Sequence, residues 1–382
     1  MSVSLPSPRA RRTLRRHEKD ATVRDAPHSV VVLASAAAAI AWVPMLLLAV
    51  AERLVGGRPE ATSLFLHDFT IHVRLLVAIP AMIVSDSLSA AAIQRCEEHL
   101  QGSGIVGSSE RLRAGIETSR RVRGSLVVSV VIALLVFGIA IAAGSRGDGM
   151  AALANMETQH GASWAGVWHG FVAFPMFRFF LLRWLFHWLV WAGFLFWIKR
   201  LDLKLVATHP DRAGGLGFLC VPVSAAIGVV FGFSATAAMA WRNAVLSQVT
   251  TFGHVRIQAA LLGAIWAVLL LAPLIVFAPR LLRLKRIALV EYSRLGHEYT
   301  QAFQDKWIRD RHDTEALLGT PDLQSLADLG TALDVVQSLR PTPIDVHLVL
   351  PVAIVYGISL LPAVLSQLSL EELLARLIKV VL

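Results

Sequence analysis

Charged side chains are scarce in this sequence: they make up 16% of its 382 residues, whereas apolar residues make up 55%. A soluble domain of this length needs more charge to cover its surface, so this balance excludes one. Short strands of alternating polarity are also missing, which excludes a membrane β-barrel. The composition predicts a helical membrane protein.

Cysteine is almost absent, with only Cys96 and Cys220. The two lack metal-ligand spacing, and we expect both near the cytoplasm, where disulfides rarely persist. No GxSxG, Walker A or HExxH pattern occurs, so little in the sequence indicates an enzyme. Asp322, Asp328 and Asp334 are spaced as a solvated helix face and not as metal ligands. We expect no metal and no cofactor.

Long apolar runs are abundant, and each of seven is long enough for a membrane-spanning helix of about 20 residues. They are Ser29–Val50, Ile71–Ala92, Gly124–Ala143, Pro175–Ile198, Gly217–Trp241, Ile257–Ala278 and Val346–Leu365. The predicted fold class is all-α: a polytopic transmembrane bundle of about seven spans with a cytoplasmic helical hairpin.

Lysine and arginine are distributed unevenly between the two ends of these spans. Of 36 such residues, 26 lie in alternate loops and eight in the loops between them. Basic loops stay in the cytoplasm, so the N terminus is predicted to be cytoplasmic and the C terminus periplasmic, in a bacterial inner membrane. This asymmetry explains the net charge of +9 without nucleic-acid binding.

This membrane topology divides the chain into four regions. Residues 1–28 form a basic tail, expected to be disordered and to lie near anionic lipid headgroups. Residues 29–278 form a membrane domain of six spans. Residues 279–345 form two cytoplasmic amphipathic helices whose apolar faces are expected to pack together. Residues 346–382 hold the seventh span and a C-terminal amphipathic helix.

Asp86 lies well inside the second predicted span and Arg183 and His187 lie inside the fourth, whereas Arg74 and Arg178 lie near the outer ends of those spans. Counted from the outer ends, Asp86 and His187 lie at similar depth, and Arg183 lies one turn further out. Charge within hydrocarbon costs several kcal/mol unless it is paired, so we expect Asp86 to meet Arg183, His187 or both. They form either an ion or proton pathway, or an ion pair that locks two helices.

Small residues recur at every fourth position of the fifth predicted span. They are Ser224, Gly228, Gly232, Thr236 and Ala240. This spacing predicts close packing of that helix against another.

A basic turn at Lys199–Lys204 is followed by a glycine-rich turn that opens the fifth span and runs from His209 to Leu219 as HPDRAGGLGFL. One interpretation is an anion-binding turn, formed by His209, Asp211, Arg212, Gly214, Gly215 and Gly217. The other is structural, because glycines permit a tight turn and Asp211 can accept hydrogen bonds from free N–H groups.

This turn and the segment LLGTPDLQSLADL at Leu317–Leu329 resemble the HPDxxGGLGFL and LLGxxDxQSLADL motifs of an uncharacterised family of bacterial multi-pass membrane proteins. Asp86 departs from that family, in which we expect glutamate. The resemblance implies a membrane topology and a bacterial origin, and it implies no reaction.

Three functional hypotheses remain. The first is a small-solute or ion transporter or channel with Asp86, Arg183 and His187 in its pathway. The alternative is a scaffold or sensor that holds a cytoplasmic partner through residues 281–339. The third is an intramembrane enzyme centred on His209 and Asp211. The expected partners are the bilayer, anionic headgroups, a cytoplasmic protein and a second copy of the chain.

Overall fold

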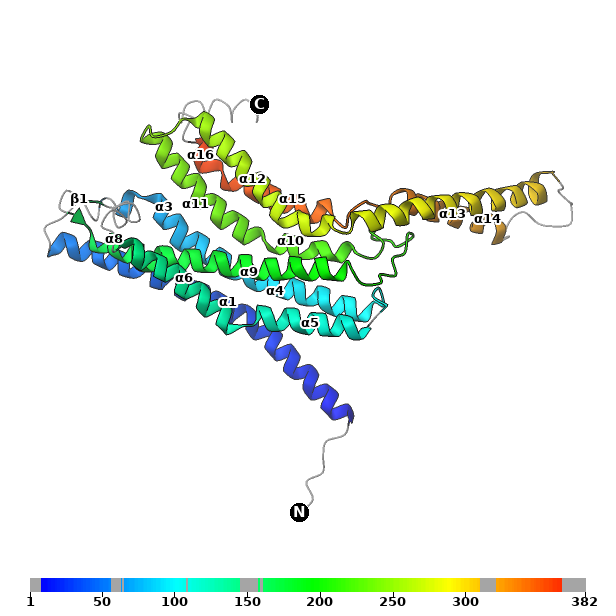
Figure 1. Ribbon diagram of the computed structural model, residues 1–382, viewed down its shortest axis with the longest axis horizontal. Coiled ribbons are helices and arrows are strands. Elements are labelled where there is room, and N and C mark those ends of the chain that lie inside the picture. Colours follow the sequence, from blue (N-terminus) through cyan, green and yellow to red (C-terminus); the bar gives the residue numbers. More distant parts are fainter. Residues whose placement is uncertain are drawn as a thin grey trace, which may run out of the picture.

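The computed structural model describes residues 8–55, 63, 65–107, 109–144, 157–158, 161–309 and 321–365. Within these ranges, seven helical segments are long and apolar enough to cross a membrane. They are His28–Leu54, Phe69–Gly102, Glu110–Ala142, Trp164–Ile198, Ile227–Leu246, Phe252–Ile275 and Val346–Leu365. The predicted all-α bundle of seven spans is confirmed (Figure 1).

Several spans consist of more than one helical element. The first four are built from α1 (Pro8–Leu54), α3 (Phe69–His72), the π-helix η1 (Val73–Ala78), α4 (Ile79–Gly102), α5 (Ser109–Arg123), α6 (Leu126–Gly144), α8 (Trp164–Trp168), the π-helix η2 (His169–Ala173) and α9 (Phe174–Ile198). Two short strands, β1 (Glu157–Thr158) and β2 (Gly161–Ala162), pair before α8.

The second half of the chain contains the last three spans and the hairpin. Its elements are the 3₁₀-helix η3 (Gly217–Cys220), α10 (Val221–Ala225), α11 (Ile227–Leu246), α12 (Phe252–Ile275), α13 (Ala278–Gln304), the π-helix η4 (Asp305–Arg309), α14 (Pro321–Gln337), α15 (Val346–Ser359) and α16 (Leu361–Leu365).

One end of the bundle carries α5, the segment 199–216 and the start of α13, and we call it the basic end; it lies toward the right of Figure 1. Two loops are joined there, because Lys204 N donates to Ile105 O at 2.7 Å and Gly107 N donates to Asp202 O at 3.1 Å. Both α4 and α9 run toward this end.

Tryptophans of α9 form the centre of the core. Trp184, Trp188 and Trp191 are each 2% exposed or less. The indole of Trp184 donates to Ser89 Oγ on α4 at 3.3 Å, and that of Trp188 donates to Leu269 O on α12 at 2.8 Å. The tryptophan face of α9 therefore packs against neighbouring helices and not against lipid.

The fifth span was predicted to be Gly217–Trp241, and its predicted start is wrong, because the span begins at Ile227. The segment from Gly217 forms η3 and α10, and a new helix, α11, begins at Ile227. Ala226 has φ −74° and ψ −3°, outside α-helical geometry, and this interrupts the hydrogen-bonding pattern. Ser224 therefore lies before the break, where its Oγ donates to Val221 O at 2.8 Å.

Two glycines of the small-residue pattern make the close approach that was predicted. A Cβ on Gly228 would lie 2.5 Å from Ala81 O, and one on Gly232 would lie 2.9 Å from Ala78 Cα. Thr236 is buried and donates to Gly232 O within its own helix. Gly228 and Gly232 therefore let α11 contact the backbone of the second span directly.

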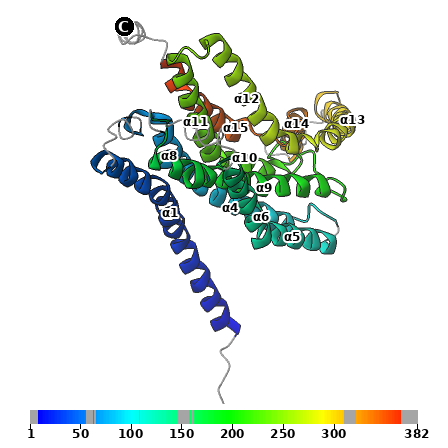
Figure 2. The same cartoon turned by 60° about the vertical axis from the view of Figure 1, so that its left-hand side comes forward.

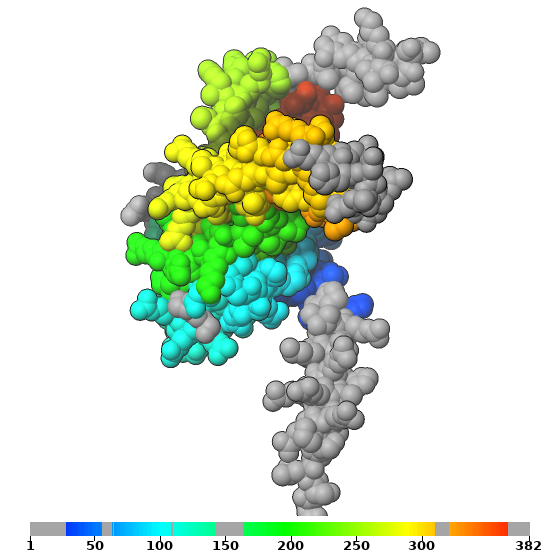
Figure 3. All heavy atoms as spheres, turned by 90° about the vertical axis from the view of Figure 1, so that its right-hand side faces the viewer, coloured from blue at the N-terminus to red at the C-terminus, as the bar shows by residue number. Residues whose placement is uncertain are grey.

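Helices α13 and α14 lie side by side and extend beyond the bundle (Figures 1 and 2). Figure 3 looks onto the basic end, where α13, in yellow, crosses the face of the molecule. Ala288 of α13 and Val336 of α14 are buried together with Ala207, and Tyr299 Oη donates to Asp322 O at 3.1 Å. The expected packing of the two amphipathic helices is present.

Two further expectations need correction. Helix α1 begins at Pro8 and continues into the first span, so the boundary expected after residue 28 is not the end of an element. The fourth span begins at Trp164 and not at Pro175, because η2 connects α8 to α9 without a turn. Residues 1–7 and the predicted C-terminal amphipathic helix after Leu365 lie outside the described residues.

We predict that Gly228→Ala destabilises the bundle, because the new methyl group would overlap Ala81 O. The expected loss in unfolding free energy is about 1 to 3 kcal/mol, typical of overpacking. Reversible unfolding in mixed micelles of detergent and SDS would measure it.

Gly138→Ala in α6 is the matched control, because a Cβ there meets nothing within 4 Å. It should leave stability unchanged or raise it by up to about 1 kcal/mol through helix propensity. Equal stability of the Gly228 variant and the wild type would contradict the proposed close contact.

Candidate functional site

The carboxylate of Asp86 projects from α4 toward α9, which supplies both of its partners. Asp86 Oδ1 lies 2.7 Å from His187 Nδ1, and Asp86 Oδ2 lies 3.5 Å from Arg183 Nε. Residues four apart share one face of a helix, so Arg183 and His187 reach the same carboxylate. The structure brings together the three residues that were singled out inside the spans.

The three side chains differ in how far they are enclosed. Asp86 and His187 are 16% and 14% exposed, whereas Arg183 is 38% exposed. The histidine contact is thus both the shorter and the more enclosed of the two. Pairing with either partner lowers the free energy of a charge in an apolar layer, where isolated charge costs several kcal/mol.

Other contacts hold this site in place. Ser89 lies one turn after Asp86 and accepts the hydrogen bond from Trp184 of α9. Ser85, the residue before Asp86, donates its hydroxyl to Ala225 O at 2.6 Å. Ser85 and Ser89 therefore bond α4 to other helices on either side of Asp86, and they help to hold the carboxylate in place.

A buried carboxylate, Glu97, was not singled out from the sequence. It is fully buried on α4, accepts a hydrogen bond from Arg120 Nε at 2.7 Å, and forms an ion pair with Arg123. The residues around Glu97, between the second and third predicted spans, are expected to form a cytoplasmic connection. The available signal was helical spacing, since Glu97 lies three turns after Asp86 on a similar face of the helix.

At the opposite end of the bundle, two π-helical segments meet. Arg74 in η1 lies 3.2 Å (Nη1 to Nε2) from His169 in η2, and its guanidinium stacks 4.7 Å from the Phe174 ring. Arg178 stacks 4.1 Å from the same ring. π-Helical turns carry no signal in residue spacing, so the sequence could not predict this contact.

The turn from His209 to Gly217 is closed by its own aspartate. Asp211 Oδ1 accepts from Ala213 N at 2.8 Å and Gly215 N at 3.1 Å, and Oδ2 accepts from Gly217 N at 2.8 Å. These amides are the groups that an external anion would need. The geometry therefore favours the structural interpretation over the anion-binding one.

Backbone conformation explains the glycines of this turn. Gly214 and Gly215 have φ of +67° and +94°, a region that side chains with a Cβ rarely enter. Arg212 also has a positive φ, 52°. A Cβ on Gly217 would lie 3.1 Å from Asp211 Oδ2, so the small residue lets the carboxylate approach.

The ionisation of Asp211 is coupled to this turn. Burial alone would raise the pKa of its carboxyl, but hydrogen bonds from the amides of Gly217, Ala213 and Gly215 and from His209 together lower that pKa below its ordinary value. His209 Nδ1 lies 2.8 Å from Asp211 Oδ1. The turn is therefore most stable with Asp211 ionised.

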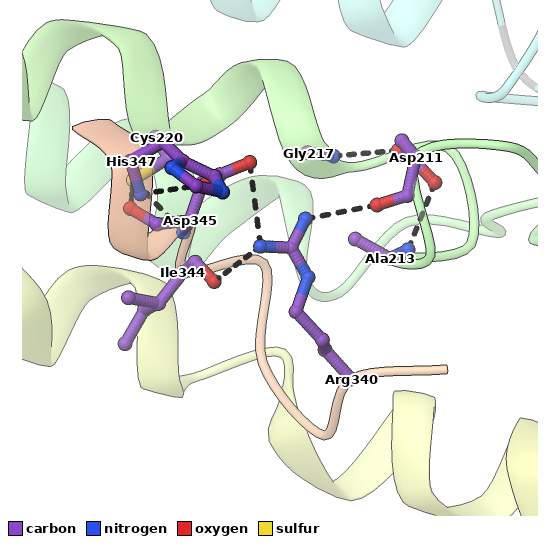
Figure 4. A network of polar contacts seen from close by, with 8 residues as sticks. All are labelled: Asp211, Ala213, Gly217, Cys220, Arg340, Ile344, Asp345 and His347. Atoms are coloured by element: carbon purple, nitrogen blue, oxygen red, sulfur yellow. Dashed lines mark hydrogen bonds and ion pairs between the residues drawn. The ribbon is translucent and has the colours of Figure 1, made fainter. Parts of the chain in front are cut away.

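Arg340 joins this turn to the last span (Figure 4). Its guanidinium donates to Asp211 O and to Ile344 O, each at 2.8 Å, and lies 3.4 Å from Asp345 Oδ2. Asp345 caps α15 by accepting from His347 N at 2.9 Å. One arginine thus connects the turn, the end of the hairpin and the start of α15.

Within the described part of the chain, no three His, Cys, Asp or Glu side chains converge as a metal site. Cys96 and Cys220 are both buried and unbridged.

No family model, no curated protein and no solved structure matches this chain. The class of protein therefore rests on the fold alone. In the described part of the chain, seven apolar helices packed around a tryptophan core identify a multi-pass integral membrane protein.

We predict that Asp211→Asn lowers the unfolding free energy by about 1 to 3 kcal/mol at neutral pH, as expected when buried hydrogen-bond donors lose an acceptor. An asparagine has only one side-chain oxygen. Its NH₂ group would take the place of the other oxygen and face a backbone N–H, and two donors cannot bond to each other. Unfolding in mixed micelles would measure the loss, with Asp202→Asn, an exposed aspartate nearby, as control.

The difference between wild type and Asp211→Asn should depend on pH. A lowered pKa stabilises the fold fully above the ordinary aspartate value of 3.8, and that stabilisation is lost as pH falls through the folded-state pKa. The unfolding free energies of wild type and Asp211→Asn should therefore become similar at pH values below the folded-state pKa of Asp211. A constant gap across the range would contradict this role of the carboxylate.

Proposed function

We propose that this protein moves an ion or small solute across a membrane, as a transporter or channel with Asp86, Arg183 and His187 in its pathway. The observation that carries the proposal is the 2.7 Å contact between Asp86 and His187 deep within two spanning helices. Both groups can exchange a proton, and ionisable groups inside a bundle often mark a route for charge.

The competing interpretation is an ion pair that only locks α4 to α9. Those helices are already held together by the Trp184–Ser89 hydrogen bond and by the buried tryptophan core. A lock also does not require a histidine beside the carboxylate. The presence of a titratable partner therefore favours transport.

The orientation forms part of the proposal. We place the basic end in the cytoplasm of a bacterial inner membrane, with the N terminus cytoplasmic and the C terminus periplasmic, because lysine and arginine gather there. The intramembrane enzyme hypothesis loses support, since the carboxylate of Asp211 is already bonded to three amides.

The proposal predicts that Asp86→Asn reduces flux in proteoliposomes to the level of empty vesicles, because the amide binds no proton or cation at this position. Proton, sodium, potassium and chloride gradients would each be tested with a fluorescent reporter. Asp86→Glu, which keeps the charge, should retain measurable flux.

Asp202→Asn serves again as control, because it removes an exposed carboxylate outside the spans. Equal flux in wild type and Asp86→Asn would remove Asp86 from the pathway. Wild-type protein that moves none of the four ions and folds normally would count against ion transport as a whole.

A scaffold or sensor is the second candidate function, favoured by the hairpin. Helices α13 and α14 extend from the bundle (Figure 1), and apolar side chains remain uncovered there, with Val290 71% and Ile308 69% exposed. Exposed apolar side chains on a projecting element are typical of a binding surface for another protein.

If the hairpin holds a cytoplasmic partner, Val290→Asp should abolish its capture from crosslinked membranes, because a charge would enter the apolar contact. Ser293→Asp adds the same charge at an exposed polar position of α13 and should preserve capture. An unchanged set of captured proteins in the Val290 variant would argue against the scaffold.

A further inference from the structure

A crevice of about 320 Å³ lies beside the Asp86–His187 pair, between α4, α9 and the turn from α5 to α6. Its lining residues are Ala90, Ile93, Gln94, Glu97, Arg120, Arg123, Gly124 and His187. Five of these have polar side chains, which is unusual for a recess in the side of a membrane bundle. These polar groups give water a set of hydrogen-bond partners inside the crevice.

The crevice connects two depths in the bundle. Its inner end is His187, at the level of Asp86, and its outer end is Glu97 with its two arginines. Glu97 follows Asp86 by eleven residues, so the two carboxylates are about 16 Å apart along α4. Ile198 follows His187 by the same number and ends α9, so Glu97 lies level with the basic end.

The crevice is large enough to hold water. Its volume of about 320 Å³ is many times the roughly 10 to 15 Å³ that a cavity needs to hold one water. The side chains of Gln94, Glu97 and Arg120 line it and can form hydrogen bonds to such waters.

We propose that this crevice is an aqueous entry by which protons from the basic end reach the His187–Asp86 pair. This inference rests on the proposed transport function and names its substrate class, the proton. The inner end is closed by the 2.7 Å contact between Nδ1 and Oδ1, which passes a proton and no larger ion.

The charges around the path argue against a metal cation as substrate. Arg120 and Arg123 flank the mouth and leave it with net positive charge after pairing with Glu97, which disfavours metal cations. Arg183 stands on the far side of Asp86. A proton taken up from water by one ring nitrogen of His187 is balanced by the proton that passes from Nδ1 to Asp86 Oδ1.

Thiol accessibility tests the crevice without relying on transport. Ala90→Cys places a thiol in the crevice, and Ala91→Cys places one at the same depth on an exposed surface about 100° round the helix. A charged, membrane-impermeant methanethiosulfonate reacts with thiolates, which form in water and not in lipid. The wild-type chain supplies the background, because both native cysteines are buried.

We expect the Ala90 variant to react at least about tenfold faster than the Ala91 variant, because only the first thiol ionises in water. The reagent should act from the side on which Ser293→Cys, exposed on α13, is labelled. Equal protection of both thiols would show that lipid or another chain fills the crevice, and would overturn the proposal.

The two proposals fail separately. If Ala90→Cys is labelled and the wild type carries no proton flux, the crevice stands as a water-filled recess while its role as a proton entry is overturned. If Asp86→Asn abolishes proton flux but Ala90→Cys resists labelling, transport stands and protons enter elsewhere. Labelled Ala90→Cys should also lose proton flux, because the added group fills the entry.

Discussion

A carboxylate inside an apolar layer must be paired, and this requirement governs how α4 and α9 meet. Asp86 can be tolerated only where Arg183 or His187 reaches it, so the rotation and depth of the two helices are restricted relative to each other. The tryptophan face of α9 then has to point into the bundle, where Trp184 and Trp188 bond to α4 and α12. The electrostatic pair and the aromatic core therefore specify the same arrangement.

Close backbone contact completes this arrangement on the other side of α4. Gly228 and Gly232 bring α11 against the backbone at Ala81 and Ala78, leaving no space for a side chain. Helices in a bilayer gain little from the hydrophobic effect when they associate, so such van der Waals contact is a main source of stability. The second span is thus held by charge on one face and by shape on another.

The sequence contained enough to predict the spans and the partners of Asp86, because apolar length and equal depth are linear properties of the chain. It also predicted that Gly228 and Gly232 pack closely, but not against which helix. The break at Ala226 and the π-turns holding Arg74 and His169 depend on tertiary contacts, so no spacing reveals them. Glu97 was missed because a charged residue near a basic loop is ordinarily solvated, whereas here α5 folds over it.

Asp211, Glu97 and Asp86 differ in how completely their carboxylates are bonded, and this difference distinguishes the structural carboxylates from the one proposed to act in transport. Asp211 accepts from three backbone amides, and Glu97 is paired with two arginines. Each of these two carboxylates is therefore bonded through both of its oxygens and acts as a fixed point of the fold. Asp86 has one short contact, to a histidine, and a 3.5 Å contact to an arginine. Asp86 lies deepest and is the least completely bonded of the three, and the proposed transport of charge relies on this arrangement.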